Sequence, residues 1–319
     1  MTYSIITAMH NDVELGRALF SSIPKRDDLE LVLVNDHSES GHVEAARTLL
    51  AESGLPHIQF IDNPYAGSLG TARNCGIEHA RGEFVIFADI DDFFTREFGA
   101  VLDTYASSPY DLVVFRKRSI GENGEASDRD STSDILFERY KKCPTDANRL
   151  ALYYHFFPVC SKLHRKRVID DHHLRFDANM PGEEINFTAR FVFCAVDKVV
   201  DCDHEIYCCL ERAGSITHSA RLTWEGLNGI VNRAFERDAF LREHETAENY
   251  NIARESSLYY VVKACQTLGI CAALKVYSAF WKRQLPLIVY NQIPVFVRQI
   301  KPKKLRRILS GFRRGCKDV

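Results

Sequence analysis

An α/β fold with a mostly parallel central sheet is the class that this 319-residue sequence predicts. In its first part, short apolar runs of strand length alternate with segments of helical periodicity, which is the pattern of right-handed βαβ units. The most apolar run, Phe84 to Ala88, lies between Gly82 and an acidic cluster, as expected of a strand buried on both faces of a parallel sheet. No GxGxxG or Walker A loop is found, which argues against ordinary dinucleotide dehydrogenases and ATPases.

The same periodicities place the other elements. Strands are expected at Tyr3 to Ala8, Leu29 to Val34, Ile58 to Ile61, Phe84 to Ala88, Asp111 to Phe115 and Val199 to Tyr207. Helices are expected at Asn11 to Ser22, Val43 to Glu52, Ser68 to Ala80, Thr95 to Tyr105 and Ile185 to Ala195. The first helix should open with a capping box of Asn11 and Glu14, and the third should end at Gly82. The polar stretch from Ser119 to Asp134 predicts an exposed loop.

The acidic cluster after Phe84 to Ala88 is the first candidate site. If the alternation of the strand continues, Asp89 and Asp91 point to the same side, roughly 6 to 7 Å apart along the backbone. The carboxyl ends of strands are where open α/β sheets bind ligands. Two carboxylates there can share Mg²⁺ or Mn²⁺, which commonly bridges protein carboxylates to a diphosphate. A solvated acidic turn is the alternative interpretation.

Charge is distributed unevenly along the chain. The formal net charge is -2, yet residues 256 to 319 carry thirteen lysines and arginines against one acid, Asp318. The acidic body and the basic C-terminal region therefore suggest separate functions. The N-terminus has neither the basic flank nor the apolar core of a signal peptide, so we expect the chain to begin in the cytosol and its ten cysteines to be thiols.

Four segments in the first ninety or so residues resemble, in the right order, the motifs of family 2 glycosyltransferases with the GT-A fold. The segments are Ser4 to Asn11, Leu33 to Ser38, Ala72 to Gly76 and Gly82 to Asp92. The resemblance implies a Rossmann-like, mostly parallel central sheet flanked by helices, with a helical C-terminal extension. The chain departs from the usual motifs at Ala8, at His10 and at Asn35 to His37.

The resemblance also implies a donor site. Ala8 and His10 would line the uracil and ribose of a UDP-linked sugar, and Asp36 would accept a hydrogen bond from the uracil N3. Arg73 would donate toward the base or the phosphates. The alternatives are a helix-capping aspartate for Asp36 and a surface arginine for Arg73.

The metal site follows from the same resemblance. Asp91 would coordinate Mn²⁺ or Mg²⁺ directly, while Asp89 would contact the ribose or a metal-bound water. The cation would stabilise the nucleoside diphosphate as it leaves, since negative charge develops on that group. Arg212 or His218, in a segment that resembles the motif closing the donor site, would touch the diphosphate or the metal.

The segment Met180 to Thr188 resembles the motif that carries the catalytic base of the family. Residue for residue, Glu184 takes the place of an aspartate that removes the proton of the acceptor hydroxyl. A carboxylate opposite the leaving diphosphate supports a single displacement with inversion. Glu183 remains an alternative base, and both glutamates could instead cap the helix that follows.

Residues 223 to 319 are expected to be helical and basic. From residue 274 on, aromatic residues interleave with lysine and arginine, which is typical of a helix on an anionic membrane surface. The charge-free run from Gln284 to Val297 is too short, and too interrupted by proline, to span a membrane. A solvated basic tail is the alternative, and nucleic-acid binding is disfavoured because no nucleic-acid module is found.

These observations lead to one functional hypothesis. The chain is expected to be an inverting, metal-dependent glycosyltransferase that moves a sugar from a nucleotide sugar to a saccharide or lipid-linked acceptor in surface polysaccharide biosynthesis. It would lie on the inner face of the cell membrane. Residues 1–222 would form the catalytic domain, with a nucleotide-sugar half at 1–118 and an acceptor half at 135–222. A catalytically inactive GT-A scaffold is the alternative; a haloacid dehalogenase phosphatase is disfavoured by Phe93.

Overall fold

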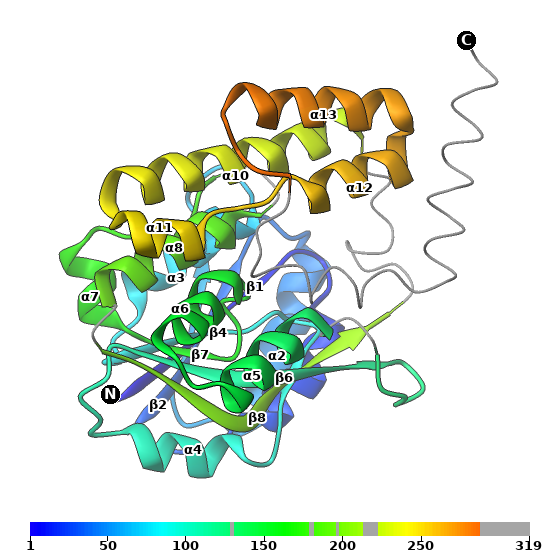
Figure 1. Ribbon diagram of the computed structural model, residues 1–319. Coiled ribbons are helices and arrows are strands. Elements are labelled where there is room, and N and C mark those ends of the chain that lie inside the picture. The colour runs from blue at the N-terminus through cyan, green and yellow to red at the C-terminus, as the bar shows by residue number, and fades with distance from the viewer. Residues whose placement is uncertain (128–130, 179–181, 196–197, 213–222, 288–319) are drawn as a thin grey trace. The chain divides into compact units, whose positions relative to one another are not determined.

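The computed structural model describes residues 1–127, 131–178, 182–195, 198–212 and 223–287 (Figure 1). These residues form two compact units. The sheet unit contains all the strands with helices α1 to α4, α7 and α8, and the helical unit contains α5, α6 and α10 to α13. The segment 131–156 therefore groups with the C-terminal helices, whereas the sequence places most of it in the acceptor half of the catalytic domain.

The sheet unit is built on a mixed sheet, ordered β3-β2-β1-β4-β7-β6-β8-β5 within the described residues. Neighbours are parallel from β3 to β4 and between β6 and β8, while β7 and β5 run antiparallel to the strands beside them. The α/β class is thus confirmed. The strands are β1 (Tyr3–Met9), β2 (Leu29–Asn35), β3 (Ile58–Asp62), β4 (Phe84–Phe87), β5 (Phe93–Phe94), β6 (Leu112–Gly121), β7 (Lys162–Arg165) and β8 (Val199–Glu211).

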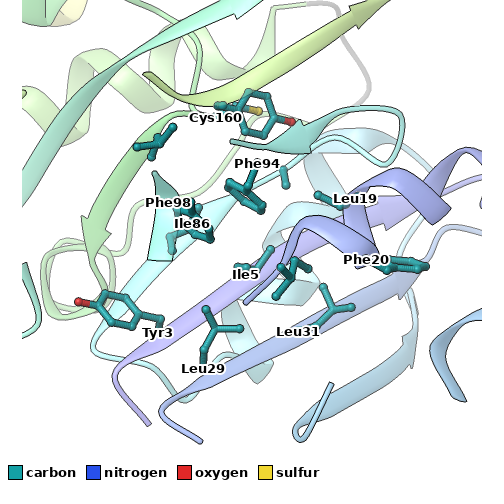
Figure 2. Packing of buried hydrophobic residues seen from close by; sticks show 14 of the residues in the cluster. Tyr3, Ile5, Leu19, Phe20, Leu29, Leu31, Ile86, Phe94, Phe98 and Cys160 are labelled. Atoms are coloured by element: carbon teal, nitrogen blue, oxygen red, sulfur yellow. The ribbon is translucent and has the colours of Figure 1, made fainter. Parts of the chain in front are cut away.

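One face of this sheet carries a continuous apolar core. Side chains such as Ile5, Leu31 and Ile86 are fully buried there against helices α1, α2 and α4, as Figure 2 shows for part of the cluster. Within this core, Phe94 and Phe98 stack with their ring centroids 3.9 Å apart. The helices of the unit are η1 (Val13–Leu15), α1 (Gly16–Ser22), α2 (Ser40–Ser53), α3 (Leu69–His79), α4 (Phe98–Tyr105), α7 (Lys166–Asp171) and α8 (Glu183–Ala195).

The other face is covered by α3 and α8. Helix α3 approaches β1 so closely that a Cβ at Gly76 would overlap the side chain of Ile6. Helix α8 packs edge-on through Phe187 against Phe87 of β4, with ring centroids 5.8 Å apart. Helix α3 follows β3 in the sequence, whereas α8 directly precedes β8. Two helices that are distant in sequence thus cover the same face of the sheet.

The helix caps predicted at Asn11 and Gly82 are both wrong. Asn11 does not cap a helix: it has a φ of 62°, and its Oδ1 accepts a hydrogen bond of 2.8 Å from the backbone N–H of Glu39. The side chain thus ties the loop after β1 to the loop after β2. Gly82 is not the cap of α3, which is Ala80. A Cβ at Gly82 would lie 2.6 Å from the backbone nitrogen of Ser4, so glycine is needed for close backbone approach.

The loop expected at Ser119 to Asp134 is also partly wrong. Strand β6 continues to Gly121, and α5 begins at Ser131. The extension has a partner, because β8 runs parallel to β6 as far as Glu211 and pairs there with Gly121. Strand pairing at long range thus overrides the polar composition of this stretch.

The helical unit has a core of its own. On α10 the buried apolar residues are Leu227, Val231 and Ala234, which pack with α12 and α13. On α12 the buried residues are Tyr260, Ala264 and Cys265. The helices are α5 (Ser131–Lys142), α6 (Asp146–His155), α10 (Trp224–His244), α11 (Ala247–Ala253), α12 (Leu258–Leu268) and α13 (Ile270–Lys282).

A buried ion pair joins parts of the helical unit that are distant in sequence. The guanidinium of Arg237 on α10 is fully buried and donates hydrogen bonds to Glu255, at 2.7 Å, and to the backbone carbonyl of Tyr154 on α6, at 2.9 Å. This pairing explains why α6 belongs to the helical unit. None of the helices in the described ranges is both long and apolar enough to cross a membrane.

Candidate active site at the carboxyl end of the sheet

The loops after β1, β2 and β3 line an open hollow of about 430 Å³. It is lined by His10, Asp36, His37, Ala66 and Gly67. The loops after β1 and β2 are bonded to each other, since the backbone N–H of Asp36 donates to the carbonyl of Met9 at 2.8 Å and His10 Nδ1 lies 2.7 Å from the carbonyl oxygen of Asp36. Two of the residues predicted to bind the donor, His10 and Asp36, therefore face one hollow.

Asp36 is held in place by a residue that the sequence analysis missed. The side chain of Asn63, in the loop after β3, donates to Asp36 Oδ1 at 2.7 Å, and both residues are buried. Asp36 is not a helix cap, because α2 has Glu39 at its N-cap position. Ala8 is half-buried within β1, where it pairs with Val34, and does not line the hollow.

The acidic cluster forms a turn, so the expectation of continued strand alternation is wrong. Strand β4 ends at Phe87, and the backbone N–H of Asp92 donates to the carbonyl of Asp89 at 3.1 Å. The N–H of Asp89 in turn donates to the phenolic oxygen of Tyr207, at 2.8 Å, which fixes the turn to β8. Asp89 and Asp91 are both partly exposed at this turn.

Asp92 is the buried member of the cluster. Its Oδ1 accepts a hydrogen bond of 2.9 Å from the backbone N–H of Leu210 on β8. Burial raises the pKa of Asp92 to about 7, and the negative charges of Asp89 and Asp91 add to the effect. Nothing in the local sequence distinguishes Asp92 from its neighbours, because its burial depends on a strand more than a hundred residues away.

Arg73 connects the acidic turn to helix α8. Its side chain is only 4% exposed, and its guanidinium donates to Asp89 Oδ1 at 2.8 Å and to Glu183 Oε1 at 3.0 Å. The same group lies over the ring of Phe176, 5.3 Å from the centroid. Burial would lower the pKa of Arg73, but the carboxylates around it, Asp89 first, raise it further and keep the group charged. Arg73 is thus no surface arginine; its predicted contact with the donor stays a prediction.

A second arginine pairs with the second aspartate of the motif. Arg212, at the end of β8, lies 3.1 Å from Asp91 Oδ2, and both side chains are 23% exposed. Arg212 therefore belongs to the same site. The other residue proposed for this role, His218, lies outside the described residues.

The donor set of the turn fits a hard divalent cation. Asp89 and Asp91 offer carboxylate oxygens, the ligands that Mg²⁺ and Mn²⁺ prefer. Within the described residues there is no group of three or more His, Cys, Asp or Glu side chains that could hold a metal ion. A cation bound here would therefore need further ligands, such as phosphate oxygens or water.

Helix α8 brings its two glutamates to the site in different ways. Glu183 is paired with Arg73, and its pKa is raised because burial outweighs that pairing. The Glu184 Oε2 accepts a hydrogen bond of 3.3 Å from the backbone N–H of Val159, in the loop before β7. The carboxylate of Glu184 is thus bonded to a segment outside its own helix.

A family comparison agrees with this arrangement. Residues 4–172 match the model of the family described as Glycosyl transferase family 2. The chain belongs to glycosyltransferase family 2. The match covers the donor-side motifs and ends before α8, so it does not include Glu184.

Relatives within family 2 are distant. The chain is 28% identical over 178 residues to the putative glycosyltransferase EpsH of Bacillus subtilis, covering 54% of this chain and 49% of EpsH. It is 24% identical over 218 residues to the poly(ribitol-phosphate) β-N-acetylglucosaminyltransferase TarP of Staphylococcus aureus, covering 67% of this chain and 64% of TarP. The chain thus spans about half to two thirds of the length of these relatives.

Solved structures share the fold. S. aureus TarS 1–349 in complex with UDP-GlcNAc superposes with a TM-score of 0.54 and 17% identity, covering 98% of this chain and 90% of that one. The mannosyltransferase PcManGT of Pyrobaculum calidifontis, in complex with GDP-Man and Mn²⁺, gives a TM-score of 0.59 at 13% identity, covering 97% and 85%. The GT-A fold expected from the motifs is confirmed.

Arg73→Met should destabilise the protein by about 2 to 3 kcal/mol at pH 7, because Glu183 and Asp89 lose their shared cation. We take the low end for a broken buried pair because Asp89 is 39% exposed. A carboxyl whose pKa is raised by folding destabilises the protein above that pKa and no longer does so below its unfolded pKa, about 4. The cost should therefore shrink between pH 7 and pH 4, as measured by urea unfolding.

The matched control is Arg17→Met. Arg17 pairs with Glu52 across an exposed surface, with side chains 61% and 59% exposed, so its loss should cost less than about 0.5 kcal/mol at either pH. An equal cost of Arg73→Met at both pH values would contradict the role of the buried carboxylates.

Proposed function

We propose that the chain is an inverting, metal-dependent glycosyltransferase that transfers a sugar from a UDP-sugar to a hydroxyl of a saccharide or lipid-linked acceptor. The observation that carries this proposal is the link made by Arg73. One guanidinium bonds both to Asp89 of the acidic turn and to Glu183, the neighbour of Glu184. A carboxylate pair suited to a diphosphate and a carboxylate suited to an acceptor hydroxyl are thereby held on one framework.

The donor nucleotide would occupy the hollow after β1 and β2. The carboxylate of Asp36 is buried and oriented by Asn63, so it can accept a hydrogen bond from a ring N–H such as that of uracil. The hollow is open to a planar base between His10, His37 and Gly67. The TarS structures in complex with UDP-GlcNAc and with UDP support a uridine nucleotide.

Asp91 and Asp89 would hold the cation, and Arg212 would face the phosphates beside it. When bound, Mn²⁺ or Mg²⁺ would act as a Lewis acid that stabilises the charge of the departing diphosphate. Arg212 and Arg73 already pair with these aspartates, so the protein supplies positive charge on the same side. The complex of PcManGT with GDP-Man and Mn²⁺ supports a metal in this fold.

Glu184 would act as the general base. Glu183 is paired with Arg73, whereas Glu184 accepts a hydrogen bond from a backbone N–H at a donor–acceptor distance of 3.3 Å. This difference supports Glu184 over Glu183 as the base. The acceptor hydroxyl would give its proton to Glu184 while its oxygen bonds to the anomeric carbon. The bond from that carbon to the diphosphate oxygen would break on the opposite face, so configuration inverts.

The basic C-terminal region would bring the enzyme to the inner face of the cell membrane, where lipid-linked acceptors for surface polysaccharides are presented. Helix α13 supports this with an exposed apolar stripe at helical spacing: Leu274, Tyr277 and Trp281 are 61%, 37% and 69% exposed. The same helix carries Lys275 and Lys282. No acid occurs between Ser256 and Lys317, so this region has no carboxylates of its own to pair with its lysines and arginines. An anionic lipid surface would complement their charge.

Asp91→Ala should remove the thermal stabilisation that UDP gives in the presence of Mn²⁺, because the cation loses the carboxylate that anchors it. In the wild type, UDP with Mn²⁺ at a hundred times its Kd should add about 2.7 kcal/mol of stability. Thermal melts with UDP, Mn²⁺ and both together measure the effect. Asp103→Ala is the control, since Asp103 on α4 is exposed and pairs with Arg26. Equal shifts in wild type and Asp91→Ala would refute the metal site.

Glu184→Gln keeps the shape of the side chain and loses only its basicity. Binding of UDP-GlcNAc should persist, while turnover should fall by about 10² to 10⁴. Turnover is measured as UDP released from UDP-GlcNAc and other UDP-sugars with a panel of saccharide acceptors. Near-normal turnover would move the base elsewhere, and UDP binding without turnover even in the wild type would favour an inactive scaffold.

Exchanging Leu274, Tyr277 and Trp281 together for serine should abolish binding to vesicles. Removing α13 would be a poorer test, because Val276 and Phe280 on its other face belong to the core of the helical unit. Wild-type binding should require anionic lipid and weaken between 0.1 M and 1 M salt, as the Debye length falls from about 10 Å to 3 Å. Co-sedimentation is the measurement, and Tyr65→Ser, at an exposed tyrosine of the sheet unit, is the control. If the triple variant sediments with vesicles to the same extent as the wild type, the stripe on α13 is not the membrane-binding surface.

A further inference from the structure

Strand β8 holds the acidic turn at both of its ends. Where the turn begins, the backbone N–H of Asp89 donates to the phenolic oxygen of Tyr207 at 2.8 Å. Where it ends, the side chain of Asp92 accepts a hydrogen bond of 2.9 Å from the backbone N–H of Leu210, and β5 pairs antiparallel with β8 directly afterwards. The position of the turn is therefore set by β8 as well as by β4, the strand that it follows.

The hydroxyl of Tyr207 takes the place of a strand carbonyl at the point where β4 leaves the sheet. The N–H of Ala88 still donates to the carbonyl of Ile6 on β1, at 3.0 Å. For Asp89, one residue later, the acceptor is the side chain of Tyr207. That side chain is fully buried, and its ring packs edge-on against Phe94, with ring centroids 5.5 Å apart. Because the close-packed core fixes the ring, the position of the hydroxyl is fixed as well.

This contact differs in kind from the two arginine pairs of the turn. Arg73 pairs with a carboxylate oxygen of Asp89, and a second arginine, Arg212, pairs with Asp91 in the same way. A divalent cation would bind these same carboxylate oxygens. The hydroxyl of Tyr207 bonds to the backbone and uses none of them. It can therefore hold the turn both before and after a cation binds.

We propose that Tyr207 is a positioning residue of the cation and diphosphate site. Its hydroxyl keeps the backbone of Asp89 in the turn that presents the carboxylates of Asp89 and Asp91. The proposal rests on the proposed function, in which these two aspartates hold the cation. Tyr207 would touch neither the cation nor the donor. It would order the turn in advance, so that the cost of ordering is not subtracted from the affinity for the ligand.

Tyr207→Phe tests this role because it removes the hydroxyl and keeps the buried ring. The affinity for UDP in the presence of Mn²⁺, measured by calorimetry, should fall about three- to tenfold, the range that the loss of one hydrogen bond corresponds to. Uridine, which has no phosphate, should bind the variant and the wild type equally, because the residues that line the hollow beside Asp36 do not belong to the turn. Without metal or nucleotide, the amide of Asp89 should exchange with deuterium faster in the variant.

Tyr3→Phe is the matched control. Tyr3 is buried in the same core, and its hydroxyl donates to the backbone carbonyl of Leu102 on α4 at 2.5 Å. Both variants lose one buried hydroxyl, so their melting temperatures should fall by similar amounts, whereas Tyr3→Phe should keep the wild-type affinity for UDP with Mn²⁺.

Three results would overturn the proposal. The first is a wild-type affinity of Tyr207→Phe for UDP with Mn²⁺. The second is an equal loss of affinity for uridine and for UDP, and the third is a Tyr207→Phe variant that does not fold although Tyr3→Phe does. The second and third results would show a purely structural role.

The variant Asp91→Ala separates this role from the metal site itself. If Mn²⁺ strengthens UDP binding in the wild type but not in Asp91→Ala, while Tyr207→Phe binds like the wild type, only the positioning role is overturned. If Mn²⁺ has no effect on UDP binding even in the wild type, the metal site fails and the role of Tyr207 fails with it. An effect of Mn²⁺ that is abolished in Asp91→Ala and reduced in Tyr207→Phe supports both.

Discussion

The site depends on one buried cation with two anionic partners. The guanidinium of Arg73 has a fixed planar geometry, so the oxygens of Asp89 and Glu183 that it binds are held at a distance set by the width of the group. One partner belongs to the turn after β4 and the other to the first turn of α8, which are about a hundred residues apart in the sequence. Because burying an arginine without partners is costly, neither segment can move away without a large loss of stability.

The sheet sets where this pairing occurs. Parallel register brings Met9 of β1 beside Asn35 of β2, and Ile6 beside Phe87 of β4, so the loops that follow these strands emerge at one edge. The small residue Gly76 lets α3 lie directly on β1. That close approach carries Arg73 to the edge, where a helix further from the sheet would leave it exposed.

The sequence was sufficient for the features that local pattern encodes. Apolar runs located β1 to β4, β6 and β8, but not the short strands β5 and β7. The motifs singled out His10, Asp36, Asp89 and Asp91, which lie in the loops that follow β1, β2 and β4. The partners of these residues could not be predicted, because Asn63, Tyr207 and Glu183 reach the site from other strands or helices. Hydrophobic periodicity reports which face is buried, but it does not report which distant polar group lies opposite.

The two faces of the sheet differ in character: one carries the apolar core, and the other carries the buried ionisable groups. The face against α1, α2 and α4 is apolar, with tight stacking such as that of Phe94 on Phe98 (Figure 2). Near α3 and α8, by contrast, burial moves the pKa values of Asp92 and Glu183 upward and that of Lys162 downward. Each of these shifts means that the charged form is less favourable in the folded chain than in water, so these groups weaken the fold at neutral pH. An apolar core elsewhere offsets that loss, which is how a protein can keep a cluster of buried ionisable groups for catalysis.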